Sequence, residues 1–263
     1  MHCPDLRKVA EIITVISQEE VLPRFKHLSV SDIDTKNSSE DFVTTADTET
    51  EKRLTNELTA LLPGSLVVGE EAAFKDPAVL DYLKEDKPVW VIDPIDGTMN
   101  FAYGRSEIGV VVALVYQGET IAGWLFNPVY KIMIMGEKGG GAWYGDKKMK
   151  VAEVKDMHKM TGVVGRRVAF KDAKLPKPVW WGSASFGYMS IISGGTHYSA
   201  YRTKIIKPWD HAAGVMLHAE AGGYTSYVDG KSYTPLVGAN HLISAPNKEA
   251  WEYLRANLCA KAD

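Results

Sequence analysis

Cysteine is scarce in this sequence, and the two that are present, Cys3 and Cys259, lie near opposite ends of the chain. Such a pair forms neither a disulfide framework nor the closely spaced ligands of a zinc finger. Long apolar runs are also missing: no stretch approaches the roughly 18 residues of a membrane span, and the N-terminal segment is too charged for a secretory signal. We therefore expect a cytoplasmic protein with no membrane partner.

A strong excess of charge of one sign is absent as well. The chain carries 33 acidic and 30 basic residues, which gives a formal charge of -3. This balance provides no broad basic face, so a nucleic-acid partner is not expected. With 263 residues, of which 45% are hydrophobic, the chain can bury a sizeable core as one large domain or as two intimately packed halves.

Hydrophobic periodicity predicts helices along much of the chain. In the first helical segment apolar side chains recur at near-helical spacing, and a Pro-Gly pair stops the second. Pro208 and an acidic residue near it mark the start of another helix. The predicted helices span residues 5–21, about 47–61, 182–193, 208–221 and 247–258.

Strands are predicted between these helices. The short apolar runs Leu66–Gly69 and Val89–Ile92 are each followed directly by carboxylates. The next apolar segments alternate with Gly and Asn-Pro breaks, the pattern of an antiparallel meander without a crossover helix. We therefore expect a layered α+β fold, with a soft division between an N-terminal half, 1–150, and a C-terminal half, 151–263, that form one compact unit.

The segment Trp90–Phe101, WVIDPIDGTMNF, places two carboxylates beside Gly97 and Thr98 directly after an apolar strand. Mg²⁺ prefers oxygen ligands, and two such ions need a bridging carboxylate, for which Asp93 is our candidate. Gly97 and Thr98 follow where a turn can lead into a helix, so their N–H groups can point at a phosphate. The alternative is a turn that uses Asp, Pro and Gly for ordinary backbone reasons.

Three further acidic residues are ambiguous when each is taken singly. Glu70 follows a strand, where it can complete a metal site and orient a water, but exposed Glu pairs are common at such positions. Asp210 begins a helix, either as a cap or as a ligand to a second ion. Asp47 likewise either caps its helix or hydrogen-bonds Thr98 and raises the basicity of a shared water. Spacing alone does not decide between these roles.

Taken together, four segments closely resemble the inositol monophosphatase family. They are DFVTTAD (41–47), GEE (69–71), WVIDPIDGTMNF (90–101) and WDHAAGVMLHAEAGG (209–223), in the family's order and at similar intervals. The resemblance covers nearly the whole chain. It implies a five-layered αβαβα sandwich, usually a homodimer, that acts as a Mg²⁺-dependent and often lithium-inhibited phosphomonoesterase.

The resemblance also implies a site for two to three Mg²⁺ ions per subunit. Glu70, Asp93 and the carbonyl of Ile95 would hold the first ion. Asp93, Asp96 and Asp210 would hold the second, and Glu70 would contribute to a weaker third. Most of these ligands lie in the N-terminal half, and the C-terminal half completes the site. No Cys or Ser nucleophile is needed, because positioning and charge neutralisation supply most of the acceleration of phosphoryl transfer.

By the same resemblance, a metal-activated water would hydrolyse a small phosphate monoester. Asp47, Thr98 and Glu70 would activate this water, and Gly97 with Thr98 would bind the phosphate. Further substrate contacts would line the sugar side of the pocket. These implied contacts are Asp96, Gly182, Ser183 and Ala184.

The alcohol part of the substrate must be predicted from weaker features. In inositol monophosphatases an acidic residue a few positions before the WD motif grips the inositol hydroxyls, and this chain has no acid between His197 and Trp209. The segment carries Arg202, Lys204 and Lys207 instead. These cations suit a second phosphate or carboxylate on the substrate, with Arg202 the strongest candidate, or they form a solvated edge or dimer rim. The departure puts myo-inositol phosphate in doubt.

Several activities therefore stay open. The first is hydrolysis of inositol-1-phosphate or a related sugar or polyol phosphate. Sibling activities act on histidinol phosphate, fructose-1,6-bisphosphate or 3′-phosphoadenosine 5′-phosphate. A non-enzymatic alternative is a regulatory protein of the transcription or ribosomal RNA machinery that retains the fold. An unused cluster of acids would repel itself, which favours an enzyme.

Some conspicuous side chains have plainer explanations. We expect Trp180, Trp181 and Tyr198 in the core or in an interface, although one ring at the pocket mouth can stack on a nucleobase or imidazole. His211 is expected to be an exposed helix residue beside a ligand. Lys36 is expected to be a flexible surface lysine.

Overall fold

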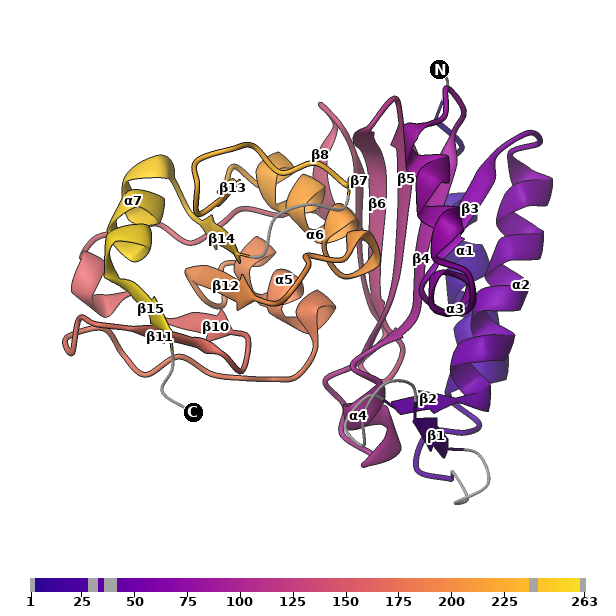
Figure 1. Cartoon of the computed structure of the whole chain (residues 1–263), viewed down its shortest axis with the longest axis horizontal. Coiled ribbons are helices and arrows are strands. Elements are labelled where there is room, and N and C mark those ends of the chain that lie inside the picture. The colour runs from indigo at the N-terminus through magenta and orange to yellow at the C-terminus, as the bar shows by residue number, and fades with distance from the viewer. Residues whose placement is uncertain (1–2, 28–32, 36–41, 237–240, 261–263) are drawn as a thin grey trace.

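The computed structural model describes residues 3–27, 33–35, 42–236 and 241–260, and Lys36 lies outside them. In this part of the chain, helices and sheets alternate in five layers (Figure 1). The layers are α1 (Leu6–Ile16) with α2 (Thr45–Leu61), a seven-stranded sheet, α5 (Ala184–Ile192) with α6 (Pro208–Glu220), a four-stranded sheet, and α7 (Lys248–Asn257). The predicted α+β sandwich is confirmed.

The outer helices form where apolar periodicity and capping side chains coincide. The Asp5 carboxylate accepts the N–H of Arg7 at 2.8 Å and starts α1, which continues through a π-helical turn η1 (Ser17–Val21). The Thr44 hydroxyl accepts the N–H of Ala46 at 3.2 Å and starts α2. Both helices bury one apolar stripe against the large sheet, including Val9, Ile13, Leu54 and Leu58.

The large sheet has the order β3-β4-β5-β6-β7-β8-β9. Its first two strands are parallel and every later pair is antiparallel, which confirms the predicted meander. Between β3 and β4 the chain forms a short helix, α3, and a 3₁₀ segment, η3. The bounds are β3 Leu66–Gly69, α3 Glu70–Lys75, η3 Pro77–Lys84, β4 Val89–Asp96, α4 Thr98–Ala102, β5 Gly109–Tyr116, β6 Glu119–Asn127, β7 Ile132–Glu137, β8 Gly141–Tyr144 and β9 Lys147–Lys148.

Strand β4 is covered by side chains on both faces. Trp90 and Ile92 belong to the core under α1 and α2, whereas Val89 and Val91 belong to the core under α5 and α6. A strand that is buried on both faces has a nearly continuous apolar sequence, as this one does. It extends to Asp96, beyond the predicted end at Ile92.

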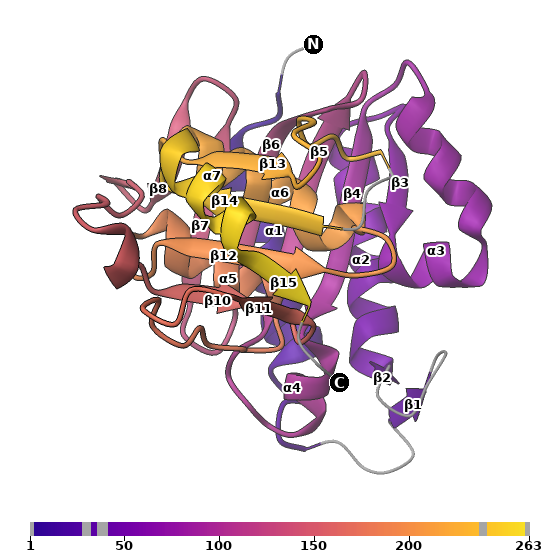
Figure 2. The same ribbon diagram turned by 60° about the vertical axis from the view of Figure 1, so that its left-hand side comes forward.

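The C-terminal half adds the remaining layers. The smaller sheet has the order β10-β12-β14-β13, and β11 pairs with β15 beside it (Figure 2). Its first strand begins after the predicted division at residue 150, and α6 packs in the core of the larger sheet. The bounds are η4 Met157–Lys159, β10 Gly162–Val164, β11 Val168–Phe170, β12 Tyr198–Arg202, β13 Tyr224–Tyr227, β14 His241–Ala245 and β15 Leu258–Ala260.

Two further features complete the description. A short hairpin of β1 (Ile33–Thr35) and β2 (Phe42–Thr44) precedes α2, so the chain enters this helix from a paired strand. Among the helices in the described ranges, none has the length and apolar character to cross a membrane.

Candidate metal centre

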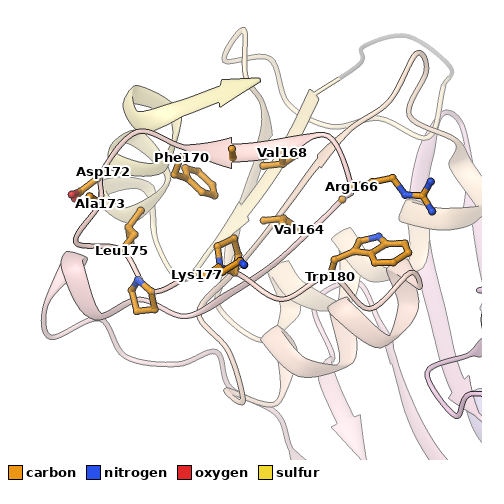
Figure 3. A pocket seen from close by; sticks show the side chains of 13 residues that line it. Val164, Arg166, Val168, Phe170, Asp172, Ala173, Leu175, Lys177 and Trp180 are labelled. Atoms are coloured by element: carbon orange, nitrogen blue, oxygen red, sulfur yellow. The ribbon is translucent and has the colours of Figure 1, made fainter. Parts of the chain in front are cut away.

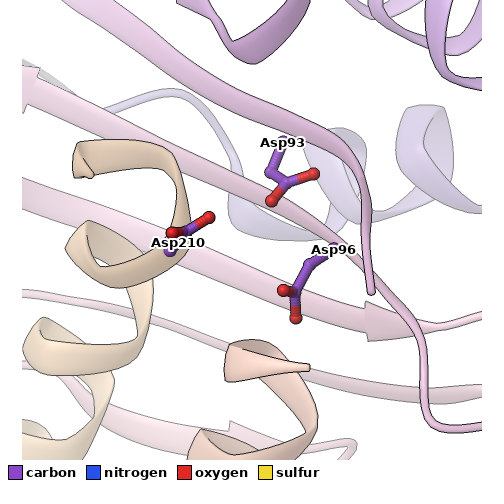
Figure 4. Close-up of side chains that lie close together, drawn as sticks. All are labelled: Asp93, Asp96 and Asp210. Atoms are coloured by element: carbon purple, nitrogen blue, oxygen red, sulfur yellow. The ribbon is translucent and has the colours of Figure 1, made fainter. Parts of the chain in front are cut away.

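Three aspartates converge where β4 ends and α6 begins (Figure 4). Asp93, Asp96 and Asp210 each present a carboxylate oxygen within 4.8 Å of the other two. Asp93 and Asp96 are buried, with exposed fractions of 1% and 7%, and Asp210 is partly buried. Like charges at this separation repel each other unless a cation or protons lie between them.

The electrostatics of the cluster follow from this crowding. Burial raises the pKa of Asp93 well above its usual range, and the charges of Glu70 and Asp96 raise it further. Burial also raises the pKa of Asp210, with Asp96 and Glu70 adding to the rise and Lys207 opposing it. All donors are carboxylate oxygens, the ligand type that suits hard Mg²⁺ better than softer metals. The cluster therefore fits a divalent cation.

A break in strand pairing brings the first two aspartates together. Residues three apart on a regular strand point to opposite faces. The register between β4 and β5 shifts between Asp93 and Asp96, so Pro94 and Ile95 form an irregular segment. The N–H of Ile95 is donated to the Asp93 carboxylate at 3.1 Å. Bulges of this kind redirect side chains at functional sites.

Glu70 lies beside Asp93 because β3 and β4 are parallel. Gly69 pairs with Ile92, so the residues that follow the two strands leave the sheet at the same edge. Glu70 is half-buried at the first position of α3. Its charge raises the pKa of both Asp93 and Asp210, which places it in the electrostatic field of the cluster.

Glu51 anchors the backbone that carries Glu70, and sequence analysis did not identify it. This carboxylate from α2 is buried, and it accepts the N–H groups of Glu71 and Ala72 at 2.8 Å each. It therefore caps the first turn of α3 from outside that helix. The signal in the sequence was its position four residues after Asp47, which places both acids on one face of α2.

Asp47 and Thr98 are joined as predicted. The Thr98 hydroxyl lies 3.2 Å from the Asp47 carboxylate and 3.0 Å from the carbonyl of Ile95. Asp47 also accepts the N–H and hydroxyl of Thr44, at 2.8 and 2.6 Å, so it caps α2 as well. Burial raises its pKa to about 7, with the charge of Glu70 adding to the rise and the hydroxyl of Thr44 opposing it.

Asp96 connects the two halves of the molecule. It accepts the Ser183 hydroxyl and the N–H of Ser185 at 2.6 Å each, and the N–H of Ala184 at 3.1 Å. These donors form the first turn of α5, where unpaired N–H groups favour a negative charge. Ser183 and Ala184 thus hold the predicted metal ligand in place.

Gly97 lies where the two halves pack closely against each other. Its φ of +87° favours glycine, and a Cβ there would lie 3.0 Å from the carbonyl oxygen of Glu107 and 3.1 Å from the Cβ of Ser183. Gly182 also has a positive φ, of +72°. The two glycines therefore let the predicted phosphate-binding turn and the start of α5 come together.

A cavity of about 240 Å³ is lined by Asp96 and Asp210 of this cluster. Its lining includes the predicted substrate residues Gly182, Ser183 and Ala184. It also includes Tyr201 and Thr203 but not Arg202, which lies between them. The structure does not bring Arg202 into this cavity, and its substrate role stays a prediction.

The structure contradicts the prediction for His211. His211 is buried, with 2% exposure, because α6 lies between two sheets, and it contributes to the wall of the cavity beside Asp210. Its Nδ1 lies 3.1 Å from the Tyr188 hydroxyl, and burial lowers its pKa to about 3, so the ring is neutral. Tyr198 is in the core as predicted, and Trp180 is 41% exposed and lines the cavity, which agrees with the alternative of a ring at the pocket mouth.

Comparisons with known proteins agree with this geometry. A sequence model described as the inositol monophosphatase family matches residues 5–262. Inositol-1-monophosphatase from Mycobacterium leprae is 34% identical over 227 residues, which cover 80% of this chain and 76% of that protein. Nus factor SuhB from Vibrio cholerae is 26% identical over 239 residues, 85% of this chain and 86% of that protein.

The fold agrees with solved structures as well. The structure of an IMPase from Thermotoga maritima superposes with a TM-score of 0.78 at 24% sequence identity. The match covers 95% of this chain and 92% of that one. The layered arrangement is therefore that of the same fold.

Proposed function

The chain belongs to the inositol monophosphatase family and is a phosphoric monoester hydrolase; from that premise we propose that it hydrolyses a small sugar or polyol phosphate with Mg²⁺. The observation that carries the proposal is the convergence of Asp93, Asp96 and Asp210 within 4.8 Å. Three clustered carboxylates, two of which line a cavity, suit a cation and a phosphate group together.

We propose that the metal ions are bound by the ligand sets that the family resemblance implies. Glu70, Asp93 and the carbonyl of Ile95 hold one ion, and Asp93, Asp96 and Asp210 hold a second. Glu70 also contributes to a third, weaker site. When bound, Mg²⁺ neutralises the phosphate charge and lowers the pKa of a bound water. The crowding of negative charge at these residues supports the assignment.

The remaining residues orient the reactants. Asp47 fixes the Thr98 hydroxyl, so this pair can accept a proton from the attacking water. In the metal-free protein, burial raises the pKa of Asp47 to about 7, and a general base is most effective when its pKa lies near the working pH. Gly97 and Thr98 are proposed to contact the phosphate, and the segment from Gly182 to Ala184 the alcohol. Positioning of this kind supplies much of the acceleration in phosphoryl transfer.

The family resemblance supports further proposals at the level of the assembly. We propose a cytoplasmic homodimer that lithium inhibits. The small phosphorylated metabolite is its ligand, and no membrane or nucleic-acid partner is proposed.

A regulatory function is the second candidate, because the relative from Vibrio cholerae is named as a Nus factor. In that case the chain would act through contacts with transcription proteins and not through turnover. The retained carboxylates favour the enzyme, since buried acids without a cation cost stability.

Phosphate release tests the proposal. Purified protein is assayed with inositol-1-phosphate, histidinol phosphate, fructose-1,6-bisphosphate, 3′-phosphoadenosine 5′-phosphate and glycerol-2-phosphate, with Mg²⁺ and with EDTA. We expect Mg²⁺-dependent release from at least one ester, and a single preferred ester identifies the substrate. No release from any of them, in protein shown to bind Mg²⁺, would favour the regulatory function.

A further inference from the structure

The cavity beside the aspartates is the smaller of two neighbouring cavities. Val164, Gly165 and Trp180 line both of them, and the larger one has a volume of about 640 Å³ (Figure 3). Asp96 and Asp210 line only the smaller cavity, of about 240 Å³, which we call the metal cavity. A phosphate group that lies at these carboxylates therefore brings the adjoining carbon atoms of its ester against the walls of the metal cavity.

The hydroxyl groups that line the metal cavity are already used within the protein. Ser183 donates to Asp96 at 2.6 Å, and Thr203 donates to a backbone carbonyl at 2.7 Å. The Tyr201 hydroxyl is directed at another backbone carbonyl at 3.4 Å. Because a hydroxyl group has a single proton, none of these three has a donor left for a substrate. A donor to the substrate must therefore come from a different side chain.

His211 lines the same cavity and has a ring nitrogen that is available to a ligand. Its Nδ1 lies 3.1 Å from the Tyr188 hydroxyl. In the described part of the chain, Nε2 of His211 makes no hydrogen bond, yet it is not among the unpartnered nitrogens that the protein encloses completely, as Nε2 of His218 is. The metal cavity is therefore the space from which a ligand reaches this nitrogen.

Two tyrosines hold the His211 ring in one orientation. The Tyr188 hydroxyl bonds Nδ1, and the Tyr201 ring lies edge-on to the imidazole, with 4.8 Å between the ring centroids. Tyr188 is itself packed against α6, because a Cβ on Gly214 would lie 2.2 Å from its ring. A side chain that is fixed in this way loses little freedom when a ligand binds, so its hydrogen bond is selective in direction.

The contact with Tyr188 also sets which ring nitrogen carries the proton. Burial raises the pKa of Tyr188 well above its usual range, so its hydroxyl is protonated and can donate to Nδ1 of His211. A neutral imidazole has one N–H, which then resides on Nε2. This N–H suits a neutral oxygen such as that of a hydroxyl group, because the ring brings no charge into the cavity.

We propose that His211 is a specificity residue whose Nε2–H donates to a hydroxyl oxygen on the alcohol part of the substrate, with Tyr188 as the residue that positions the ring. The proposal rests on the proposed phosphatase function and adds a substrate contact to the same site. His211 directly follows Asp210, so the hydroxyl that it contacts lies close to the phosphate. The site therefore selects an ester with a hydroxyl on the carbon next to the one that carries the phosphate.

Esters that differ by this hydroxyl test the proposal. The pairs are glycerol-1-phosphate and 1,3-propanediol phosphate, glucose-1-phosphate and 2-deoxyglucose-1-phosphate, and adenosine 3′-monophosphate and 2′-deoxyadenosine 3′-monophosphate. The ester that the wild type hydrolyses best is added, together with its analogue that lacks the hydroxyl. We expect kcat/KM to be about fivefold or more higher for the hydroxylated member of at least one pair, the size of one neutral hydrogen bond.

Variants then assign this preference to the residues. His211→Leu should reduce it to less than about twofold, through a lower kcat/KM for the hydroxylated member alone. His211→Gln should keep part of the preference, because its amide can still donate. Tyr188→Phe retains the imidazole but removes the hydroxyl that orients it, so the preference should fall less than in His211→Leu.

His218→Leu is the matched control. His218 lies about two turns later on α6, is fully buried, and has its Nδ1 3.0 Å from the Thr225 hydroxyl, but it does not line the metal cavity. We expect a loss of stability in urea unfolding like that of His211→Leu, with the wild-type preference retained. The preference is a ratio measured on one preparation, so it does not depend on the fraction of the protein that is folded.

The outcomes separate the two proposals. A preference that is unchanged in His211→Leu, or an equal loss for both members of a pair, overturns the contact between His211 and the hydroxyl. Turnover without a preference in any pair, or a best ester that has no hydroxyl on that carbon, also overturns it and leaves the phosphatase intact. No Mg²⁺-dependent release from any ester is instead a failure of the proposed function.

Discussion

Ser183, which belongs to the C-terminal half, orients Asp96 of the N-terminal half. Its buried hydroxyl donates to Asp96 at 2.6 Å, and the same oxygen accepts the N–H of Phe186 at 3.2 Å. The predicted ligand thus depends on a side chain from beyond residue 150 for its orientation, which is the usual role of partners behind a metal ligand.

Ser183→Ala should therefore weaken Mg²⁺ binding without unfolding the protein. We expect the Mg²⁺ concentration for half-maximal phosphate release to rise about tenfold or more, and stability to fall by about 1 kcal/mol. A Mg²⁺ titration of phosphate release and urea unfolding measure the two effects. Ser193→Ala, at an exposed position just after α5, is the control and should match the wild type.

The protonation of one residue, Glu51, should make the stability of the protein depend on pH. Burial raises its pKa from 4.5 to about 7, while the N–H groups of Glu71 and Ala72 oppose the rise. The folded state therefore holds more protons than the unfolded chain between these two pH values. Stability from this group is highest below the unfolded pKa and falls as pH rises through the folded pKa.

We predict that the metal-free protein loses stability between about pH 4.5 and pH 7, by on the order of 1–3 kcal/mol from Glu51. Glu51→Gln should reduce that loss, because the amide has no charge to bury. Urea unfolding at pH 5 and pH 7.5 in EDTA measures the difference between the two proteins. Parallel pH profiles for wild type and variant would show that Glu51 does not titrate in this range.

Some of the site residues could be predicted from the sequence and others could not. Asp93 and Glu70 were predicted because they follow apolar strands and match a known pattern of segments. Glu51 was missed because its partners, the N–H groups of Glu71 and Ala72, belong to another helix, and because Glu51 is not part of a chemical motif. His211 was misplaced because helix periodicity does not show that α6 is covered on two sides.

At the scale of elements, the junction of β3 and α3 is tightly packed against α2. A Cβ on Gly69 would lie 2.3 Å from the Glu51 carboxyl carbon. The cap of α3 by Glu51 depends on this close approach. The predicted strand bounds for β3 were correct, but the reason for its terminal glycine was not visible without α2.

Gly69→Ala should displace Glu51 and loosen α3. We expect a loss of about 1–3 kcal/mol in unfolding free energy, together with a lower kcat because Glu70 moves with the helix. Gly165→Ala is the control for stability, since its nearest contact at 3.7 Å is ordinary van der Waals distance and its φ is not positive. Equal stability of the two variants would contradict the tight junction.

Strand β4 shows what element prediction from sequence misses. Its apolar run indicated Val89–Ile92, but the strand continues through an irregular segment to Asp96. Pro94 removes a backbone donor, which is typical of a strand end, and here it falls in the bulge. The apolar pattern therefore ended four residues before the strand did, within the segment that carries both aspartates.

At the scale of the whole molecule, the acidic cluster that is proposed to bind the metal lowers the stability of the metal-free fold. The cluster joins β4 of the first half to α6 of the second, and its mutual repulsion works against their association. A bound cation removes that repulsion and links the halves. The layer order was expected only from the family resemblance, because sequence periodicity does not reveal which faces meet.

We predict that Mg²⁺ raises the melting temperature, by an amount that grows with the logarithm of its concentration above the dissociation constant. Asp93→Asn should lose this response and, in EDTA at neutral pH, should be at least as stable as the wild type, because it removes a buried charge. Differential scanning calorimetry with Mg²⁺ and with EDTA measures both effects. An unchanged Mg²⁺ response in the variant would argue against a bridging role.

The most direct test of the metal centre is phosphate release as a function of Mg²⁺ in wild type and Asp93→Asn, with Asp146→Asn as an exposed control. The account predicts saturable Mg²⁺-dependent turnover in the wild type and the control, and a loss of a hundredfold or more, on the order seen when charge stabilisation is removed, in Asp93→Asn. Near-normal Mg²⁺-dependent turnover in Asp93→Asn would contradict it.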